Sequence, residues 1–209
     1  MKLLIGLMLL AGFVSMQAEE WLQWSASRAR DTAKAAYVQG RVGGFFDMRM
    51  LKTETSYNYK LAATWMTRDV IRGTARTLQL TERLSDADTR ALVEEADKAG
   101  DTVVMVEIDP REGSGIIPND WSAFLQKKVS DPDFARAVRG VNTPALKGVK
   151  ALAGVIRRNY DYDRFWVVFP LTHPDGKKLF AANDSEAELV VRIAGREGHV
   201  SWPIPAGVR

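Results

Sequence analysis

The sequence predicts an α+β fold. We expect an antiparallel β-sandwich, with an immunoglobulin-like topology as one version, that carries an N-terminal helix and an inserted helical hairpin. Apolar residues alternate with others over 57–65, and again over 189–204, where a glycine-bounded turn divides the pattern into a hairpin. Such alternation is typical of half-buried strands, and roughly seven or eight such segments at short spacings favour a sandwich or barrel. Helical spacing interrupts the alternation over 67–99.

Residues 1–18 have the pattern of a secretory signal peptide, with a basic start, an apolar run over 3–14 and a small residue, Ala18, at the end. The apolar run is shorter than the ~20 residues that span a bilayer. Met16 stands where a cleavage site prefers a small residue, so retention as an uncleaved anchor is the alternative. The pattern predicts an exported protein, periplasmic or extracellular, in which 19–209 form a single domain.

Composition narrows the possible chemistry. The chain has 209 residues and no cysteine, so disulfides, thiolate catalysis and cysteine-ligated metal sites are excluded. Its 29 basic and 26 acidic residues give a net charge of +3, and the pI near 9.2 is a pointer to anionic partners. Neither a phosphate-binding loop nor a dinucleotide fingerprint is present. We therefore expect no cofactor, no nucleotide and no nucleic-acid partner.

The first mature segment, 20–40, is expected to be a helix, because Ala26, Ala29 and Ala33 recur at helical spacing. A stripe of alanines buries little area and suits close packing on a flat partner. The pattern then changes to a period of two, which predicts strands over 45–50 and 57–65.

The helical insert is expected to be a hairpin of two helices. Thr67 and Ser85 are its predicted N-caps, and Gly100 stands where a helix C-cap belongs. In chain order, the remaining expectations are a buried strand over 103–108, a strand over 119–127, a short helix over 130–140, a strand over 149–158, a strand over 165–171 and the final hairpin over 189–204.

The densest polar and aromatic cluster lies over 157–164 and is the favoured binding site. Its candidate residues are Arg158, Tyr160, Asp161, Tyr162 and Asp163. In an extended chain both aspartates face one way and both tyrosines the other. Paired carboxylates can share a proton or a metal ion, but the neighbouring arginines favour ordinary ion pairs. We expect the turn-rich 109–115 loop beside this cluster.

A basic stripe is the other candidate surface. Arg68, Arg72, Arg76 and Arg83 fall within about 80° of one another on a helix, and Arg72 and Arg76 are taken as its binding residues. Such a stripe can meet anionic lipid or phosphate, whereas the ordinary interpretation is a solvated face. Trp21 and Trp24, at the mature N-terminus, suit either a membrane interface or packing.

No arrangement of nucleophile and base stands out. Ser114 lies in a glycine-rich turn without the spacing of a nucleophile elbow, and the two histidines, His173 and His199, are not paired in sequence. The sequence thus favours a cell-envelope binding or protein-interaction module over an enzyme. The alternatives are an envelope hydrolase that uses Asp161/Asp163 or His173, and a peripheral membrane protein that binds anionic lipid through the arginine stripe.

Overall fold

The computed structural model describes residues 20–43, 58–100, 102–109, 117, 119–129, 137–156, 162–205 and 207–208. The helical elements in these ranges are η1 (Glu20–Gln23), α2 (Ala26–Lys34), α3 (Arg68–Glu82), α4 (Asp86–Asp97), η4 (Pro144–Gly148) and η5 (Lys150–Leu152). The strands are β1 (Tyr37–Val42), β2 (Tyr59–Trp65), β3 (Thr102–Asp109), β4 (Ser122–Lys127), β5 (Val138–Arg139), β6 (Val141–Asn142), β7 (Asp163–Phe169), β8 (Glu186–Ile193) and β9 (Arg196–Pro203).

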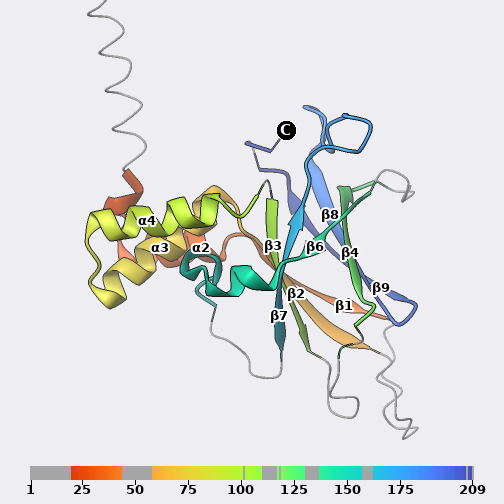
Figure 1. The fold of residues 1–209 in the computed structure, drawn as a ribbon, viewed down its shortest axis with the longest axis horizontal. Helices are drawn as coiled ribbons and strands as arrows, with labels where there is room; N and C mark the ends of the chain where they lie inside the picture. The colour runs from red at the N-terminus through yellow and green to blue at the C-terminus, as the bar shows by residue number, and fades with distance from the viewer. Residues whose placement is uncertain are drawn as a thin grey trace, which may run out of the picture.

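The fold is α+β, as the sequence predicts, with one antiparallel sheet of nine strands among the described residues (Figure 1). The strand order is β5-β4-β8-β9-β1-β2-β3-β7-β6. The predicted two-sheet sandwich and its immunoglobulin-like version are not confirmed, because these strands are joined in a single hydrogen-bonded sheet. The two edge strands, β5 and β6, are separated by Gly140 alone, so one short segment lies along both edges and the sheet is nearly closed into a barrel.

The interior of this barrel-like sheet is the larger of two apolar cores. Alternate residues of the long strands point inward and meet there, and Trp65, Phe169, Phe180 and Leu189 are among the buried side chains. Trp65 lies edge-on to Trp202, with ring centroids 5.7 Å apart, which is a favourable aromatic geometry. Strand pairing and this core together account for the period-two pattern seen in the sequence.

The second core lies between the outer face of β3 and β7 and the helices, which gather on one side of the sheet (Figure 1). Strand β3 is therefore buried on both faces: Val104 and Val106 point into the barrel, whereas Val103 and Met105 point to the helices. This double burial explains why the strand is a continuous apolar run rather than an alternating one.

The alanine stripe packs as closely as the sequence predicts. Ala29 and Ala33 of α2 are 0% and 1% exposed and lie against Gly73 of α3. A Cβ atom added at Gly73 would lie 2.6 Å from the Ala29 carbonyl oxygen and 2.8 Å from the Ala33 nitrogen. The two helices thus touch backbone to backbone, and any larger residue at this crossing would push them apart.

The helical hairpin is formed by α3 and α4, with the predicted caps in place. The Thr67 hydroxyl accepts a hydrogen bond from the Val70 amide at 3.3 Å, and the Ser85 hydroxyl accepts one from the Asp88 amide at 3.1 Å. Each cap satisfies an amide that would otherwise lack a partner in the first helical turn. Gly100 follows the hairpin with a positive φ of 116°, a conformation that glycine adopts without steric cost.

The N-terminal helix is shorter than the predicted 20–40 segment. It ends at Lys34, and the chain continues as β1, in which Tyr37 pairs with Thr64 of β2. Hydrogen bonding to the adjacent strand thus overrides the helical spacing of the small residues in this region.

Two other predicted elements are wrong in the described parts. The segment 149–158, predicted as a strand, contains the 3₁₀ helix η5, whose Leu152 carbonyl accepts a hydrogen bond from the Trp166 indole at 2.9 Å. The segment 130–140, predicted as a helix, ends in strand β5, because pairing with β4 draws it into the sheet.

Several expectations fall outside the described residues. The predicted signal peptide over 1–18, the predicted strand over 45–50 and the Ser114 turn all lie there. Among the helices that the structure describes, none has the length and apolar character needed to cross a membrane.

Candidate functional site

The polar cluster over 157–164 is only partly described. Arg158, Tyr160 and Asp161 lie outside the described residues. Tyr162 is half-buried, and Asp163 is exposed as the first residue of β7. The described part therefore carries one carboxylate of the predicted pair, at the surface.

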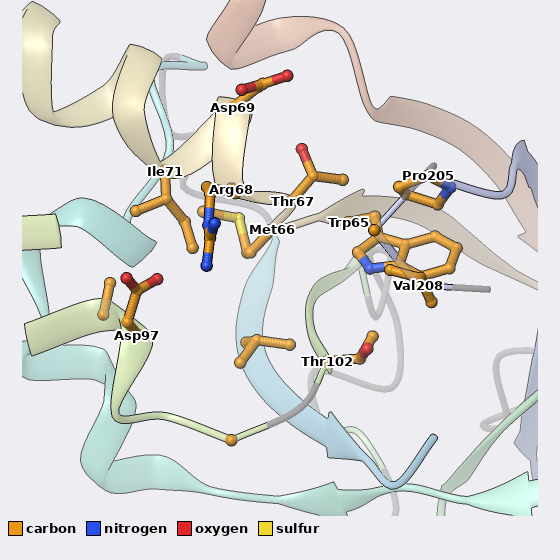
Figure 2. Close-up of a pocket in the computed structure, with 14 residues that line it drawn as sticks. Trp65, Met66, Thr67, Arg68, Asp69, Ile71, Asp97, Thr102, Pro205 and Val208 are labelled. Carbon is orange, nitrogen blue, oxygen red and sulfur yellow. The ribbon is translucent and has the colours of Figure 1, made fainter. Parts of the chain in front are cut away.

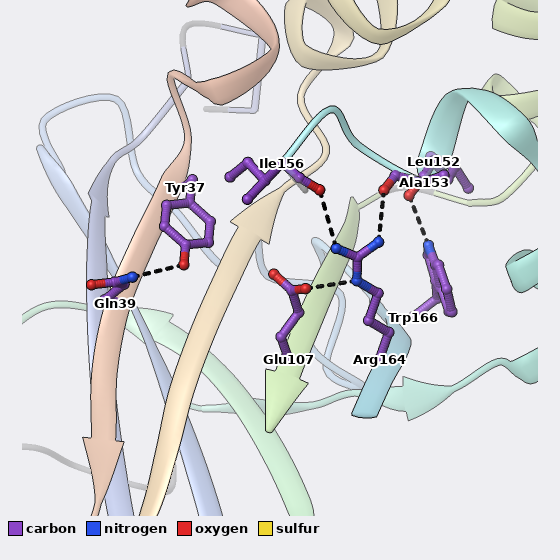
Figure 3. Close-up of polar contacts among 8 residues, drawn as sticks. All are labelled: Tyr37, Gln39, Glu107, Leu152, Ala153, Ile156, Arg164 and Trp166. Atoms are coloured by element: carbon purple, nitrogen blue, oxygen red, sulfur yellow. Dashed lines mark hydrogen bonds and ion pairs between the residues drawn. The ribbon is translucent and has the colours of Figure 1, made fainter. Parts of the chain in front are cut away.

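Arg164 does not pair with Asp163, because adjacent residues of a strand point to opposite faces. Its Nε atom instead donates to Glu107 Oε1 of β3 at 2.6 Å, and its guanidinium also donates to the carbonyl oxygens of Ala153 at 3.4 Å and Ile156 at 3.3 Å (Figure 3). The Arg164 and Glu107 side chains are 14% and 6% exposed. Arg164 thus links the 153–156 segment to the outer face of the sheet through hydrogen bonds.

The strand register places the two predicted loops at the same end of the sheet. Ile108 of β3 pairs with Asp163 of β7, so Asp109, where the predicted 109–115 loop begins, lies beside the described end of the 157–164 cluster. Asp109 is buried and forms an ion pair with Lys60 of β2 at 3.3 Å. At this end, Asp109 is therefore engaged with Lys60, and Glu107 with Arg164.

The arginine stripe is partly engaged within the protein. Arg76 donates from Nε to the Trp24 carbonyl oxygen at 2.9 Å and from Nη1 to Gln79 Oε1 at 2.6 Å. Arg72 is half-buried and lies 3.8 Å from Asp69. Trp21 and Trp24 are buried in the helical core, which is the packing alternative named for them. Arg76 thus holds the N-terminal segment against α3.

His173 lies in a cleft of about 530 Å³ beside the 171–179 turn, together with Lys127, Asp175 and Asp184. A hydrogen bond from Lys177 holds the pKa of the Asp175 carboxyl below its usual range. Asp163 begins β7, whereas His173 follows its end. These two candidate acid–base residues are therefore at opposite ends of a strand and cannot act on one bond.

A larger cavity, of about 650 Å³, lies where the helical hairpin meets one end of the sheet. We call it the helix–sheet cavity. Its walls come from the β2–α3 junction, the end of α4, the start of β3 and the C-terminal segment. Trp65, Met66, Ile71 and Val103 supply apolar surface, and Val208 of the C-terminal segment lies next to Trp65 (Figure 2).

Two opposite charges extend into this cavity without engaging each other. Arg68 is the first residue of α3 and Asp97 is the last residue of α4. Figure 2 shows both side chains reaching into the space between the helix ends, whereas the Asp69 carboxylate is directed away from Arg68. Arg68 and Asp97 form no hydrogen bond or ion pair with any residue that the structure describes.

A buried hydroxyl group also lines the cavity. Thr102, which also lines the cavity, is 3% exposed, and its hydroxyl has no hydrogen-bond partner in the described part of the chain. Buried polar groups in proteins are hydrogen-bonded with few exceptions. The cavity therefore combines an apolar floor with three polar groups, Arg68, Asp97 and Thr102, that are free to engage a bound molecule or water.

Sequence patterns do not point to this cavity, because its walls come from four separate parts of the chain. The sequence assigned Arg68 to the basic stripe, although its position directly after an N-cap also places it at a helix start. The order Trp65-Met66-Thr67-Arg68, in which a strand passes into a helix, is the one local signal of a junction.

Comparison with protein-family models, curated proteins and solved structures finds no match. Within the described ranges, no group of three or more histidine, aspartate or glutamate side chains is placed to hold a metal ion.

Proposed function

We propose that this protein is an exported binding module that holds a small molecule in the helix–sheet cavity. The observation that supports this proposal is the cavity itself: about 650 Å³ of space, with two charged side chains on its walls that have no partner among the described residues. Ligand sites are typically concave and of about 300–1,000 Å³, and they combine apolar surface with polar groups that orient the ligand. Trp65, Met66 and Ile71 correspond to the apolar part, and Arg68 and Asp97 to the orienting groups.

The position of the cavity also suits binding. It lies between two packed units, the helical hairpin and the barrel-like sheet, each with its own core. Side chains buried in those cores, such as Trp65 and Ile71, hold the apolar walls in place. A site whose walls are fixed before the ligand arrives loses little conformational entropy on binding.

A fragment screen followed by amide chemical shifts tests the binding proposal. We expect fragments that bind to shift the backbone amides of Arg68, Gly100 and Gly207, all of which line the cavity. Gly207→Trp should weaken binding, because a Cβ atom at Gly207 meets nothing within 4 Å and a large ring there can occupy the cavity mouth. Gly148→Trp is the matched control, since its Cβ is equally unobstructed and it lies in η4. Shifts that map elsewhere, or that Gly207→Trp leaves unchanged, would contradict the proposal.

The export proposal is supported by the signal-like pattern over 1–18 and has its own test. Intact-mass analysis of the protein purified from its native cells should show a chain that begins at Glu19, because Ala18 is the small residue before the predicted cleavage point. Met16→Ala should make cleavage more complete, because it supplies the second small residue of the preferred site. Detection of the full 209-residue chain as the dominant species would favour the retained anchor.

A further inference from the structure

We propose that the ligand of the helix–sheet cavity is a small zwitterion, with one acidic group, one ammonium group and an apolar body. This inference rests on the proposed binding function and names the chemistry of the ligand. Its basis is the juxtaposition of the Arg68 guanidinium and the Asp97 carboxylate on the wall of one cavity, each without a partner among the described side chains.

The acidic group of the ligand is assigned to Arg68. A guanidinium is always charged and can donate two parallel hydrogen bonds to a carboxylate or phosphate. Arg68 is also the first residue of the 15-residue helix α3, whose N-terminal end carries a partial positive charge. The Thr67 hydroxyl caps the Val70 amide and leaves the Arg68 and Asp69 amides facing the helix end. Side chain and helix thus favour an anion at the same place.

The ammonium group of the ligand is assigned to Asp97. This carboxylate ends the 12-residue helix α4, and a helix C-terminus carries a partial negative charge. The charge of the side chain and that of the helix end again have the same sign. The cavity therefore has a positive wall and a negative wall, which is the electrostatic complement of a zwitterion.

The apolar body of the ligand would lie against the floor of the cavity. Met66, Ile71 and Val103 are each less than a tenth exposed and line this floor, so they remain in place when the cavity is filled. The Thr102 hydroxyl, buried beside them with no hydrogen-bond partner in the part of the chain that the structure describes, provides a further hydrogen-bonding group. Inorganic phosphate alone would leave both Asp97 and this apolar surface unused.

Zwitterions of this kind come from several sources, and the test separates them. Titrations followed by amide shifts would use L-leucine, Leu-Leu, and short-chain phosphatidylethanolamine below its micelle concentration. Leucinamide lacks the anion, N-acetyl-leucine lacks the ammonium group, and inorganic phosphate lacks the apolar body. We expect at least one zwitterion to bind about fivefold to tenfold more tightly than its single-charge analogues, a range set by charge-assisted hydrogen bonds at a partly open site. The source that binds most tightly identifies the natural class.

Two substitutions make the charge assignment specific. Arg68→Gln should weaken binding of the zwitterion. It should also remove the preference of the protein for the zwitterion over leucinamide, because the contact with the anionic group is lost. Asp97→Asn should remove the preference over N-acetyl-leucine. Glu82→Gln on α3 and Glu94→Gln on α4 are matched controls, because neither residue lines the cavity, and each should leave all affinities within about twofold, the scale of exposed charge effects.

The proposal is overturned if the zwitterions and their single-charge analogues bind alike, if phosphate binds as tightly as the zwitterions, or if Arg68→Gln and the Glu82→Gln control have equal effects. If fragments shift the cavity amides while these charge preferences are absent, the zwitterion assignment fails and the binding function stands. If no compound shifts those amides, both fail.

Discussion

Replacing Glu107 with alanine is expected to lower the free energy of unfolding by about 3–5 kcal/mol, because it leaves a buried guanidinium without its carboxylate. The Arg164 and Glu107 side chains are 14% and 6% exposed and 2.6 Å apart. Arg164 would keep only its two longer hydrogen bonds to backbone carbonyls, which do not neutralise its charge. Urea unfolding of the purified domain measures the loss directly.

The matched control is an exposed ion pair that also joins η5 to the rest of the protein. Lys150 and Glu82 are 3.1 Å apart with exposed fractions of 58% and 41%, so Glu82→Ala should cost less than about 1 kcal/mol. Replacing both buried partners, as Glu107→Leu with Arg164→Met, should recover much of the stability lost in Glu107→Ala. If Glu107→Ala and Glu82→Ala lower the free energy of unfolding equally, the buried ion pair contributes no more to stability than the exposed one.

Gly140→Ala is expected to destabilise the fold by about 2–3 kcal/mol through overpacking at the closure of the sheet. Gly140 separates β5 from β6, and its amide donates to the Ala123 carbonyl oxygen at 2.9 Å. A Cβ atom here would lie 2.3 Å from Val167 Cγ1 and 2.6 Å from Phe169 Cε1. Both neighbours are core side chains, so they have little room to move away.

Thermal and urea unfolding would measure this effect, with Gly148→Ala as the comparison. A Cβ atom at Gly148 meets nothing within 4 Å, so that variant should stay within about 0.5 kcal/mol of the original protein, as surface changes usually do. If Gly140→Ala is as stable as Gly148→Ala, the described closure between β5 and β6 is not tightly packed.

Regular elements with a strong local pattern could be predicted from the sequence. The strand ending at Trp65, the capped helices after Thr67 and Ser85, and the final hairpin all have periodicity or cap residues that act within one segment. The alanine stripe of α2 was also informative, because small residues at helical spacing have few uses other than close packing, here against Gly73.

The arrangement of the sheet could not be predicted, because it depends on pairing between distant segments. Alternation shows that a strand has one buried face, and both a sandwich and a barrel-like sheet supply one. The distinction depends on residues 138–142, whose two very short strands pair with β4 and β7. Strands of two residues leave almost no periodicity to detect.

The candidate site shows the same limit of local patterns. The sequence favoured segments rich in polar residues, such as the one that contains Asp163 and Arg164. In the structure, Arg164 is paired with Glu107. Sequence patterns place Arg68 only in the basic stripe and do not single out Asp97, because each is one charge on a polar helix surface. Only the packing of α3, α4 and the sheet brings them to one cavity.

The most direct test of the central claim uses the absence of cysteine from the chain. Gly207→Cys places a single thiol on the lining of the cavity, and Gly148→Cys places one at a position that does not line it; a Cβ atom at either position meets nothing within 4 Å. The rate of alkylation of each thiol would be measured with and without the tightest compound from the screen. If the cavity is the binding site, the compound slows alkylation at position 207 and leaves position 148 unchanged. Equal rates at position 207 with and without the compound would contradict the account.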